Sequence, residues 1–479
     1  MSAQSPSSRR AFLRATAGLA AAAAHPLGPR LSLPLAMNLA GLGALAAQQA
    51  QAATTSDGYK ALVCLYMAGG NDGHNWLVPT DSTNYKSYAA ARAELAWPSA
   101  KLQAITSTTQ GSGRSFGMPL ELAPLRSWYE SGRCAMLANV GTLVRPVTKA
   151  DYQAGVGLPA KLFSHNDQQA TWQSLQPEGA PSGWGGRMGD ALMGANQYPV
   201  FTAVSASGNA VFLSGNSVTQ YQVGASGPVQ INAAQAGWHA GSNSVPASLR
   251  TMLASSGADA FQAEYLKVVQ RSLSTASTLQ GALNSTSPMS LPTAPVTLPD
   301  GSTLALNNDA LAKQLRIVAQ MIAAGPSLGM KRQVFMVSIG GFDTHSFQMR
   351  DQPLLMARVA QSVNWFLTAM QGAGLLNNVV LFSASDFGRS LLSNGDGSDH
   401  GWGNHHFIAG GAVKGQAIYG TMPVTALNTA DDIGSGRLLP STSVTQYAAP
   451  LGRWMGLNSS ELGTVLPNLG NFSGGPAFL

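Results

Sequence analysis

Short, uninterrupted runs of apolar residues recur along the chain, each followed by glycine or polar residues. The first, 61–67, leads into Gly69 and Gly70, and an apolar run without polar alternation is typical of a strand buried on both faces. Segments with an apolar residue every three or four positions lie between such runs and predict helices. The predicted strands are 61–67, 135–140, 333–339, 379–383 and the weaker 407–409, and the predicted helices are 120–129, 259–283, 306–324, 354–370 and 446–455. Strands that alternate with helices predict an α/β fold with a central, largely parallel sheet flanked by helices.

Two segments depart from this pattern. Residues 196–246 are rich in Gly, Ser, Val and Gln, with short alternating runs that predict a small β-rich insertion or cap over one edge of the sheet. Residues 285–303 are rich in Ser, Thr and Pro, which predicts a surface loop. The chain has 479 residues and shows no internal repeat, so we expect residues 54–479 to form one large α/β domain.

The first 53 residues have the composition of an export signal. Arg9 and Arg10 precede the alanine-rich run 15–24, which gives a basic region followed by a weakly apolar one. The paired arginines resemble the twin-arginine signal of bacteria, which serves proteins exported already folded. An ordinary surface helix with two arginines is the alternative.

We therefore predict a twin-arginine signal peptide over residues 1–53, with cleavage near Ala52 or Ala53. Its partner would be the twin-arginine export machinery, and the mature protein would be periplasmic or secreted. No uninterrupted apolar run reaches the roughly 18 residues that a spanning helix needs, so we expect no transmembrane segment in the mature chain.

The charge of the chain argues against a nucleic-acid partner. The 28 basic and 22 acidic residues give +6, but the leader holds Arg9, Arg10, Arg14 and Arg30 and no acid, which leaves 24 against 22, or +2. A body with so little excess charge and no basic cluster is not typical of a protein that neutralises phosphates. Cys64 and Cys134 are the only cysteines, and either a disulfide or two buried thiols would be compatible with export.

Polar residues embedded in glycine follow the predicted strands. Asp72 follows the first strand, Asp343 and His345 follow the strand at 333–339, and Asp386 and then His400 follow the strand at 379–383. Because the carboxyl ends of parallel strands meet at one edge of a sheet, we expect these side chains to converge. Carboxylate and imidazole together favour zinc or manganese, with calcium or magnesium still open, and the number of groups predicts two divalent ions. The alternative is that these residues cap helices and form turns.

These segments resemble a known family, the twin-arginine-exported DUF1501 proteins of the alkaline phosphatase and sulfatase-like superfamily. The matching segments are 69–73 (GGNDG), 163–168 (FSHNDQ) with Trp172, 183–187 (GWGGR), 341–345 (GFDTH), 385–389 (SDFGR), and 394–401 leading into 410–415. The resemblance implies an alkaline phosphatase-like α/β sandwich. Asp386 stands where the family commonly has Glu, and Phe342 where it commonly has Trp.

The resemblance also implies a layout of ligands. Asp72 and Asp386 would bind one metal ion, and Asp343, His345 and His400 would hold the other. Whether His405 or His406 replaces His400 stays open.

Three further residues are candidates for catalysis. Ser164 would be a nucleophile at a helix N-terminus, or simply the N-cap of that helix, with Asp167 three residues on. His165 would be a base, a metal ligand or an anion contact. Arg389 would clamp a tetrahedral anion with its planar fork, or form a surface salt bridge.

Together these features predict an exported metal-dependent hydrolase that cleaves small anionic phosphate or sulfate esters. The first alternative is a non-catalytic periplasmic or surface binding protein that keeps the metal-bearing fold. A structural export partner without metal is the second. The substrate and the oligomeric state are not readable from the sequence.

Overall fold

Strand β1 (Lys60–Met67) lies between two parallel neighbours, β11 (Arg332–Ile339) and β12 (Val379–Ser385). The pairing runs along the whole of β1, so that Met67 lies opposite Ile339 on one side and Ser385 on the other. The three strands therefore end together, and the polar residues that follow them start from one edge. The computed structural model describes residues 58–479 except 108, 230–241, 254 and 256–258, so the predicted signal peptide and its cleavage site lie outside the described residues.

Further strands extend this sheet on both sides. The order is β16–β5–β15–β12–β1–β11–β6–β7–β8, with β17 beside β5. The added strands are β5 (Cys134–Gly141), β6 (Ala203–Ser205), β7 (Tyr221–Gly224), β8 (Gly227–Pro228), β15 (Asn404–Gly410), β16 (Ile418–Tyr419) and β17 (Thr442–Ser443). Each predicted strand belongs to the sheet, whose pairs are mostly parallel, which confirms the predicted fold class.

Strand β15 runs antiparallel to both β12 and β5. Its first residue, Asn404, lies opposite Val140 near the carboxyl end of β5. Residues that precede β15, among them His400, therefore reach the edge that residues following the parallel strands also reach.

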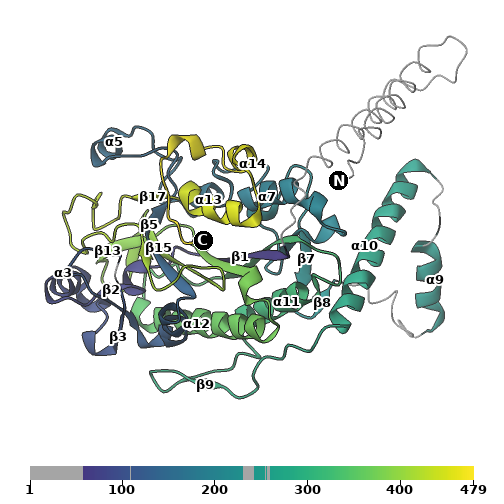
Figure 1. The fold of residues 1–479 in the computed structure, drawn as a ribbon, viewed down its shortest axis with the longest axis horizontal. Helices are drawn as coiled ribbons and strands as arrows, with labels where there is room; N and C mark the ends of the chain where they lie inside the picture. The colour runs from purple at the N-terminus through teal and green to yellow at the C-terminus, as the bar shows by residue number, and fades with distance from the viewer. Residues whose placement is uncertain (1–57, 108, 230–241, 254, 256–258) are drawn as a thin grey trace, which may run out of the picture. The chain divides into compact units, whose positions relative to one another are not determined.

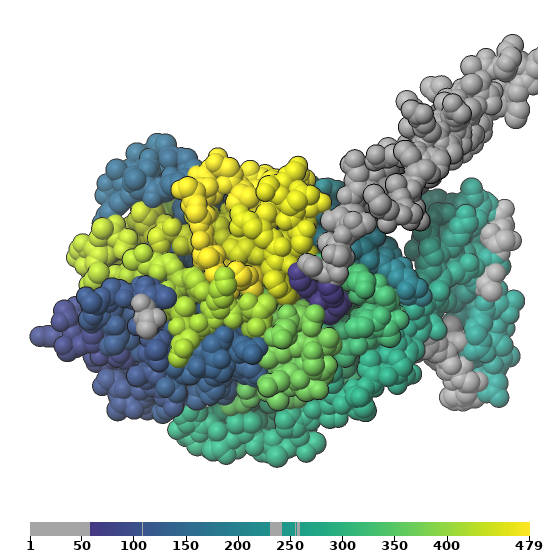
Figure 2. All heavy atoms as spheres, viewed as in Figure 1, coloured from purple at the N-terminus to yellow at the C-terminus, as the bar shows by residue number. Residues whose placement is uncertain are grey.

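Helices cover both faces of the sheet (Figure 1). On β1, Ala61, Val63 and Leu65 pack into the core with α3, α4, α11 and α12, whereas Leu62, Cys64 and Tyr66 pack into the core with α6, α7, α13 and α14. Figure 2 shows the C-terminal helices, in yellow, filling the upper part of the surface in that view. The helices are α3 (Ser82–Arg92), α4 (Ala123–Glu130), α5 (Lys149–Ala154), α6 (His165–Ser174), α7 (Trp184–Leu192), α9 (Ser244–Leu253), α10 (Ala260–Asn284), α11 (Ala310–Ala324), α12 (Gln348–Gly372), α13 (Val444–Met455) and α14 (Ser459–Val465).

Helix α12 begins six residues before the predicted start at Leu354. The sequence places Pro353 just before the apolar pattern, where proline normally marks a helix start. The structure adds a turn and a half that carries Gln348 and Gln352, both of which are buried. Their side chains bond to other polar groups rather than to the apolar core, so the apolar pattern could not reveal them.

The segment 196–246 is partly strand, as predicted, but its described strand β6 pairs in parallel with β11 and β7 pairs in parallel with β6, so both extend the central sheet. After residues 230–241, which lie outside the described residues, the chain continues into α9 and α10, which pack on each other through a small cluster around Leu253 and Leu266. In Figure 1 these two helices stand at the edge beside β8.

The remaining strands form small sheets outside the central one. They are β2 (Val78–Pro79), β3 (Leu102–Ile105) and β4 (Phe116–Pro119) in one sheet, the hairpin β9 (Val296–Thr297) and β10 (Thr303–Leu304), and the pair β13 (Arg389–Ser393) and β14 (Ser398–His400). The hairpin lies within the segment predicted as a surface loop. Among the described residues no helix has the length and apolarity to cross a membrane.

Both cysteines are buried and free. Cys64 lies on β1 and Cys134 on β5, with β12 and β15 between them. Three strand spacings of about 4.8 Å separate the two residues by roughly 14 Å, twice the Cα separation that a disulfide spans. Of the two alternatives, the structure therefore has the buried thiols.

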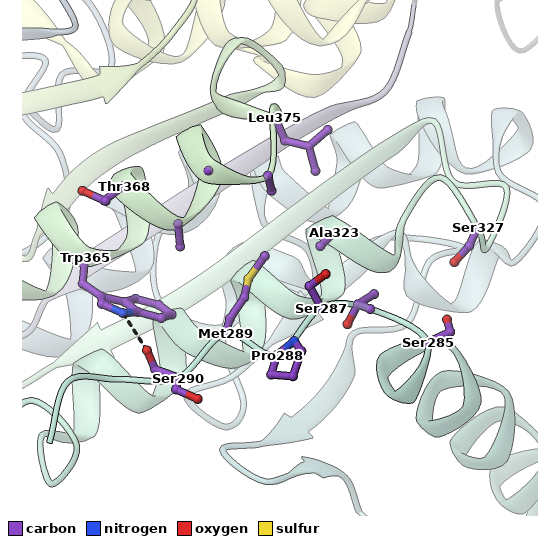
Figure 3. Close-up of a pocket in the computed structure, with 14 residues that line it drawn as sticks. Ser285, Ser287, Pro288, Met289, Ser290, Ala323, Ser327, Trp365, Thr368 and Leu375 are labelled. Atoms are coloured by element: carbon purple, nitrogen blue, oxygen red, sulfur yellow. Dashed lines mark hydrogen bonds between the residues drawn. The ribbon is translucent and has the colours of Figure 1, made fainter.

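A cavity of about 620 Å³ lies where the loop around Met289 meets the C-terminal ends of α11 and α12 (Figure 3). Trp365 forms part of its wall, and none of its lining residues is charged. Gln348, at the other end of α12, lies 17 residues before Trp365, a rise of roughly 25 Å along the helix, so this cavity is remote from the edge where the polar residues gather.

Candidate metal centre

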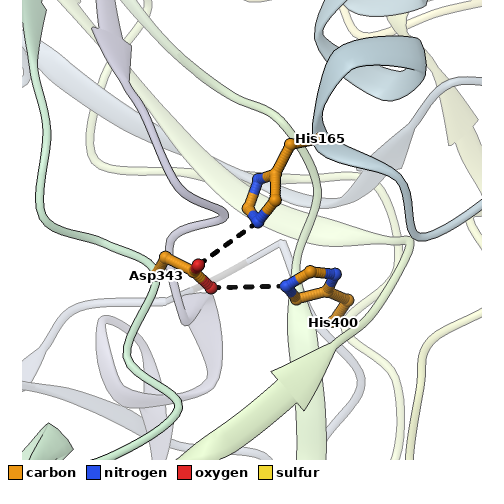
Figure 4. Close-up of side chains that lie close together, drawn as sticks. All are labelled: His165, Asp343 and His400. Atoms are coloured by element: carbon orange, nitrogen blue, oxygen red, sulfur yellow. Dashed lines mark hydrogen bonds and ion pairs between the residues drawn. The ribbon is translucent and has the colours of Figure 1, made fainter.

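Asp343 lies at the middle of a cluster of histidines at the carboxyl edge of the sheet. It follows β11, and its carboxylate lies 3.4 Å from Nε2 of His165 and 3.3 Å from Nε2 of His400. His165 is the first residue of α6, and His400 is the last residue of β14. Figure 4 shows the two imidazole rings directing one nitrogen each at a different oxygen of Asp343. Asp343 and His400, two of the residues expected to converge, lie together, and His165 from α6 joins them.

His165 is oriented by Asp386. Its Nδ1 lies 2.7 Å from Oδ2 of Asp386, a buried carboxylate that also accepts hydrogen bonds from the Tyr66 hydroxyl (2.7 Å) and the Gly69 amide (3.3 Å). The hydrogen bond to Asp386 raises the pKa of His165, against the opposing effect of burial. Because an ionised carboxylate only accepts, Nδ1 carries the proton, and in the neutral ring Nε2 presents its lone pair to Asp343.

His400 is oriented in the same way by the main chain. Its Nδ1 lies 2.7 Å from the carbonyl oxygen of Phe163, so Nδ1 donates and the neutral ring leaves a lone pair on Nε2. Burial lowers the pKa of His400, which favours the neutral ring that binds metal. Phe163 itself has φ of +72°, in the left-handed region that a residue with a side chain seldom adopts, and this conformation supplies the carbonyl that His400 uses.

His345 supplies a fourth donor. Its Nε2 lies 3.2 Å from Oδ1 of Asp343 and 2.8 Å from Nε2 of His400, while its Nδ1 lies 3.4 Å from Oδ1 of Asp399. This contact needs a proton on one of the two nitrogens, or a cation that both share, because two bare lone pairs would repel.

These residues fit a divalent metal ion. Donor atoms of His165, Asp343 and His400 lie within 4.8 Å of one another, and among the described residues they form the group that could hold a metal ion. Bonds of about 2.1 Å in a tetrahedron place neighbouring donors about 3.4 Å apart, which agrees with the contacts to Asp343. Nε2 of His165 is buried and makes no hydrogen bond, so it has an open valence toward the cluster. Imidazole nitrogens with a carboxylate favour zinc or manganese.

Asp72 lies in a different environment from the one predicted. Its carboxylate forms a buried ion pair with Arg92 and accepts hydrogen bonds from the Gln348 amide and from the main-chain N–H of His74 (3.1 Å). Burial by itself would raise the pKa of Asp72, but Arg92, His74 and Gln348 together lower it, so the group is ionised. Asp72 and Asp386 thus each bond to protein donors, and neither belongs to the metal-ligating group described above.

Arg389 is buried, and its hydrogen bonds go to protein acceptors. Its guanidinium donates to Asp343 (3.0 Å), to the Gly69 carbonyl (3.0 Å) and to the Ser398 carbonyl. Burial alone would raise the pKa of Asp343, but the hydrogen bond and charge of Arg389 keep that pKa low. In this arrangement Arg389 orients Asp343, and its predicted contact with a substrate anion stays a prediction.

Ser164 precedes His165 at the start of α6. Its hydroxyl donates to Oδ2 of Asp167 at 2.8 Å and makes no capping hydrogen bond to the helix. The Ser164 side chain therefore does not cap the helix, and its hydroxyl donates to a carboxylate instead.

His405 and His406 lie in the interior. Burial lowers the pKa of His405 and of His406 to about 3. Nδ1 of His405 accepts a hydrogen bond from the Asn139 amide, and Nδ1 of His406 lies 3.2 Å from the Ser383 hydroxyl. His400, rather than either of these, lies beside Asp343.

Sequence reasoning missed Tyr66, Arg92 and Gln348. Tyr66 lies within a run that is apolar on both faces, so nothing marks it as a partner of Asp386. Arg92 ends a polar helix that reads as solvent-exposed, and Gln348 lies before the apolar pattern of α12. Tyr66 meets Asp386 320 positions away and Gln348 meets Asp72 276 positions away, whereas Arg92 lies only 20 positions from Asp72.

The fold and the cluster define an α/β protein with a candidate His/Asp metal centre at the carboxyl edge of its sheet. A family model described as a protein of unknown function, DUF1501, matches residues 59–466. The chain belongs to the DUF1501 family, which confirms the predicted membership. No curated protein matches it in sequence.

Several solved sulfatase structures are distantly similar to the chain. A protein from work on the metabolism of multiple glycosaminoglycans by Bacteroides thetaiotaomicron has 11% identity and a TM-score of 0.32 over 83% of this chain and 74% of its own. A 2-O GAG sulfatase has 12% identity and a TM-score of 0.26 over 80% and 72%. The PsFucS1 sulfatase from Pseudoalteromonas sp. has 12% identity and a TM-score of 0.26 over 88% and 71%. Similarity at this level supports no conclusion about activity.

Proposed function

We propose that this protein is a metal-dependent hydrolase of small anionic esters, phosphate or sulfate. The observation that carries the proposal is the orientation of His165 and His400. Each has Nδ1 bonded to an acceptor and Nε2 directed at an oxygen of Asp343. Side chains held by outer hydrogen bonds in this way are typical of metal ligands.

The ion would be held by Asp343, His165 and His400, with His345 as a fourth donor. A divalent ion bound there would polarise an oxygen of the ester and lower the pKa of a nearby hydroxyl or water. Arg389 keeps Asp343 ionised and oriented, and Asp386 keeps His165 in the tautomer that binds metal.

Ser164 is the nucleophile in this proposal. It is adjacent in sequence to the proposed ligand His165, and its hydroxyl proton already has an acceptor in Asp167. The first turn of α6, a helix of 10 residues, directs main-chain N–H groups outward, where they favour an anionic ester group.

A second candidate is a binding protein that retains the metal centre without hydrolysis. The observation that favours it is that the donors of Arg389 go to protein acceptors, which leaves this fork without a free edge for an anion.

The two functions are separated by a combined assay. Metal-depleted protein is reloaded with zinc, manganese, calcium or magnesium and given aryl phosphates and aryl sulfates. We expect turnover that requires the ion, is abolished in Asp343→Asn and falls strongly in Ser164→Ala. Asp300→Asn, an exposed acid in the turn between β9 and β10, is the matched control and should keep full activity. Bound metal without turnover on either ester class would leave the binding protein as the function.

We also propose that residues 1–53 direct export through the twin-arginine machinery to the periplasm or beyond. The support is the arginine pair Arg9 and Arg10 before an alanine-rich run. The mass of the secreted chain should correspond to a chain that begins at residue 53 or 54. Replacement of both arginines by lysine should leave the full-length chain inside the cell. A mature chain that still contains residue 9 would contradict the proposal.

A further inference from the structure

Asp72, which the family resemblance assigns to a second ion, is instead paired with Arg92. Asp72 follows β1 directly, and Arg92 reaches it from the last residue of α3. Both side chains are completely buried. The guanidinium is fixed at its other end as well, because it donates to the carbonyl oxygens of Ser390 (3.1 Å) and Leu391 (3.2 Å) on β13.

The remaining contacts of Asp72 are also filled by the protein. Gln348 donates to the carboxylate and accepts from the Ser398 hydroxyl, and Gln352 donates to the main-chain carbonyl of Asp72 at 3.0 Å. One negative and one positive charge thus face each other within a network of protein hydrogen bonds, and a divalent ion added there would be an uncompensated charge.

Both oxygens of Asp386, the other predicted ligand of that ion, already accept hydrogen bonds from the protein. Oδ1 accepts from Tyr66, and Oδ2 from His165 and Gly69. The residue after it is Phe387, whose ring packs against His165 and His400 with centroid separations of 4.8 and 4.6 Å. The residue after Asp386 therefore supplies an apolar ring against the two histidines and no further ligand.

We infer that the protein binds one divalent ion and that Arg92 is a permanent internal cation in place of a second. The inference rests on the proposed metal centre at Asp343. It implies that the charge at Asp72 is balanced at any supply of metal, so that only the Asp343 centre responds to the ion.

The first test counts ions. Metal-depleted protein is saturated with zinc, freed of excess by gel filtration and measured by elemental analysis. We expect one ion per chain in the wild type and none in Asp343→Asn. Two ions per chain, one of them lost in Asp72→Asn, would overturn the inference while the proposed centre stands. No bound ion in the wild type would remove the centre itself and the inference with it.

The second test removes the internal cation. Arg92→Met leaves a buried carboxylate unpaired, so its Tm should fall on the order of 5 °C, and millimolar magnesium should restore part of that loss. The double variant Arg92→Met/Asp72→Asn has no charge to balance, so its Tm should recover and should not respond to magnesium.

In the double variant the zinc affinity should stay within about threefold of the wild type, since the Asp343 centre is untouched. A tenfold or larger loss of zinc affinity there, or an Arg92→Met variant with wild-type Tm, would overturn the inference. Because the double variant restores neutrality, it gives this result even where the single variant fails to fold.

Discussion

Two polar clusters lie at the same edge of the sheet and differ in whether their polar atoms stay free to bind a ligand. The metal cluster, Asp343 with His165, His345 and His400, has its central carboxylate side chain 45% exposed, whereas the side chain of Asp72 in the ion-pair cluster with Arg92 is 0% exposed. In the first, the outer hydrogen bonds leave lone pairs directed at one point. In the second, each charge already meets its opposite.

The comparison teaches that an acid at a strand end is not by itself a metal ligand. Asp72 and Asp343 follow neighbouring strands in similar glycine-rich segments, yet only Asp343 is surrounded by nitrogens with open valences. The partners from other elements decide the difference: histidines from α6 and β14 in one case, and an arginine from α3 in the other.

The largest effect should come from Asp343→Asn. Loss of the central carboxylate charge removes a direct ligand, so zinc affinity should fall on the order of 1,000-fold, beyond the 10–100-fold typical of an outer partner. The amide still offers an oxygen to Arg389, so the fold should be retained. Titration calorimetry on metal-depleted protein measures the affinity, and circular dichroism checks the fold. An unchanged affinity would show that the cluster is not a metal centre.

Tyr66→Phe should have the next largest effect. Without the hydroxyl, Asp386 loses a donor and holds His165 less firmly, so zinc affinity should fall by about 10- to 100-fold. Tyr59→Phe is the matched control. Tyr59 is also buried, but it lies just before the first residue of β1, at the end away from the metal cluster, and its hydroxyl donates to Gln333. Equal affinities in the two variants would contradict a role for Tyr66 in positioning His165.

His74 makes the ion-pair cluster sensitive to acid. Burial lowers its pKa to about 4, from the usual value near 6.5, so between these pH values the unfolded chain binds a proton that the folded chain does not. Stability should therefore be unaffected by this group above pH 6.5 and fall by roughly 1.4 kcal/mol per pH unit below it. Urea unfolding at pH 7 and pH 5 should show a loss about 2 kcal/mol smaller in His74→Gln than in the wild type. Parallel pH profiles would rule out this contribution.

Asp399→Asn should have the smallest effect. Asp399 contacts His345 at 3.4 Å, and both side chains are nearly half exposed, so solvent screens the interaction. We expect a decrease in zinc affinity of no more than about fivefold, measured by the same calorimetry. A loss as large as that of Tyr66→Phe would make His345 as essential as His165.

The sequence determined the framework of the molecule. Uninterrupted apolar runs marked β1, β5, β11 and β12, because a strand buried on both faces is apolar at successive positions and so can be recognised from the local sequence. The rule that ligands gather beyond the carboxyl ends of parallel strands then placed Asp343 and His345 together at that edge.

Tertiary structure decided how each charge is used. His165 was open among three roles in the sequence, and its contact with Asp386, 221 positions away, now fixes its tautomer. Arg92 ends a helix that reads as a solvated one, yet it is buried against Asp72. Local pattern reflects burial of whole faces, whereas the pairing of single polar groups depends on which distant elements meet, and that information exists only once the sheet and its helices are assembled.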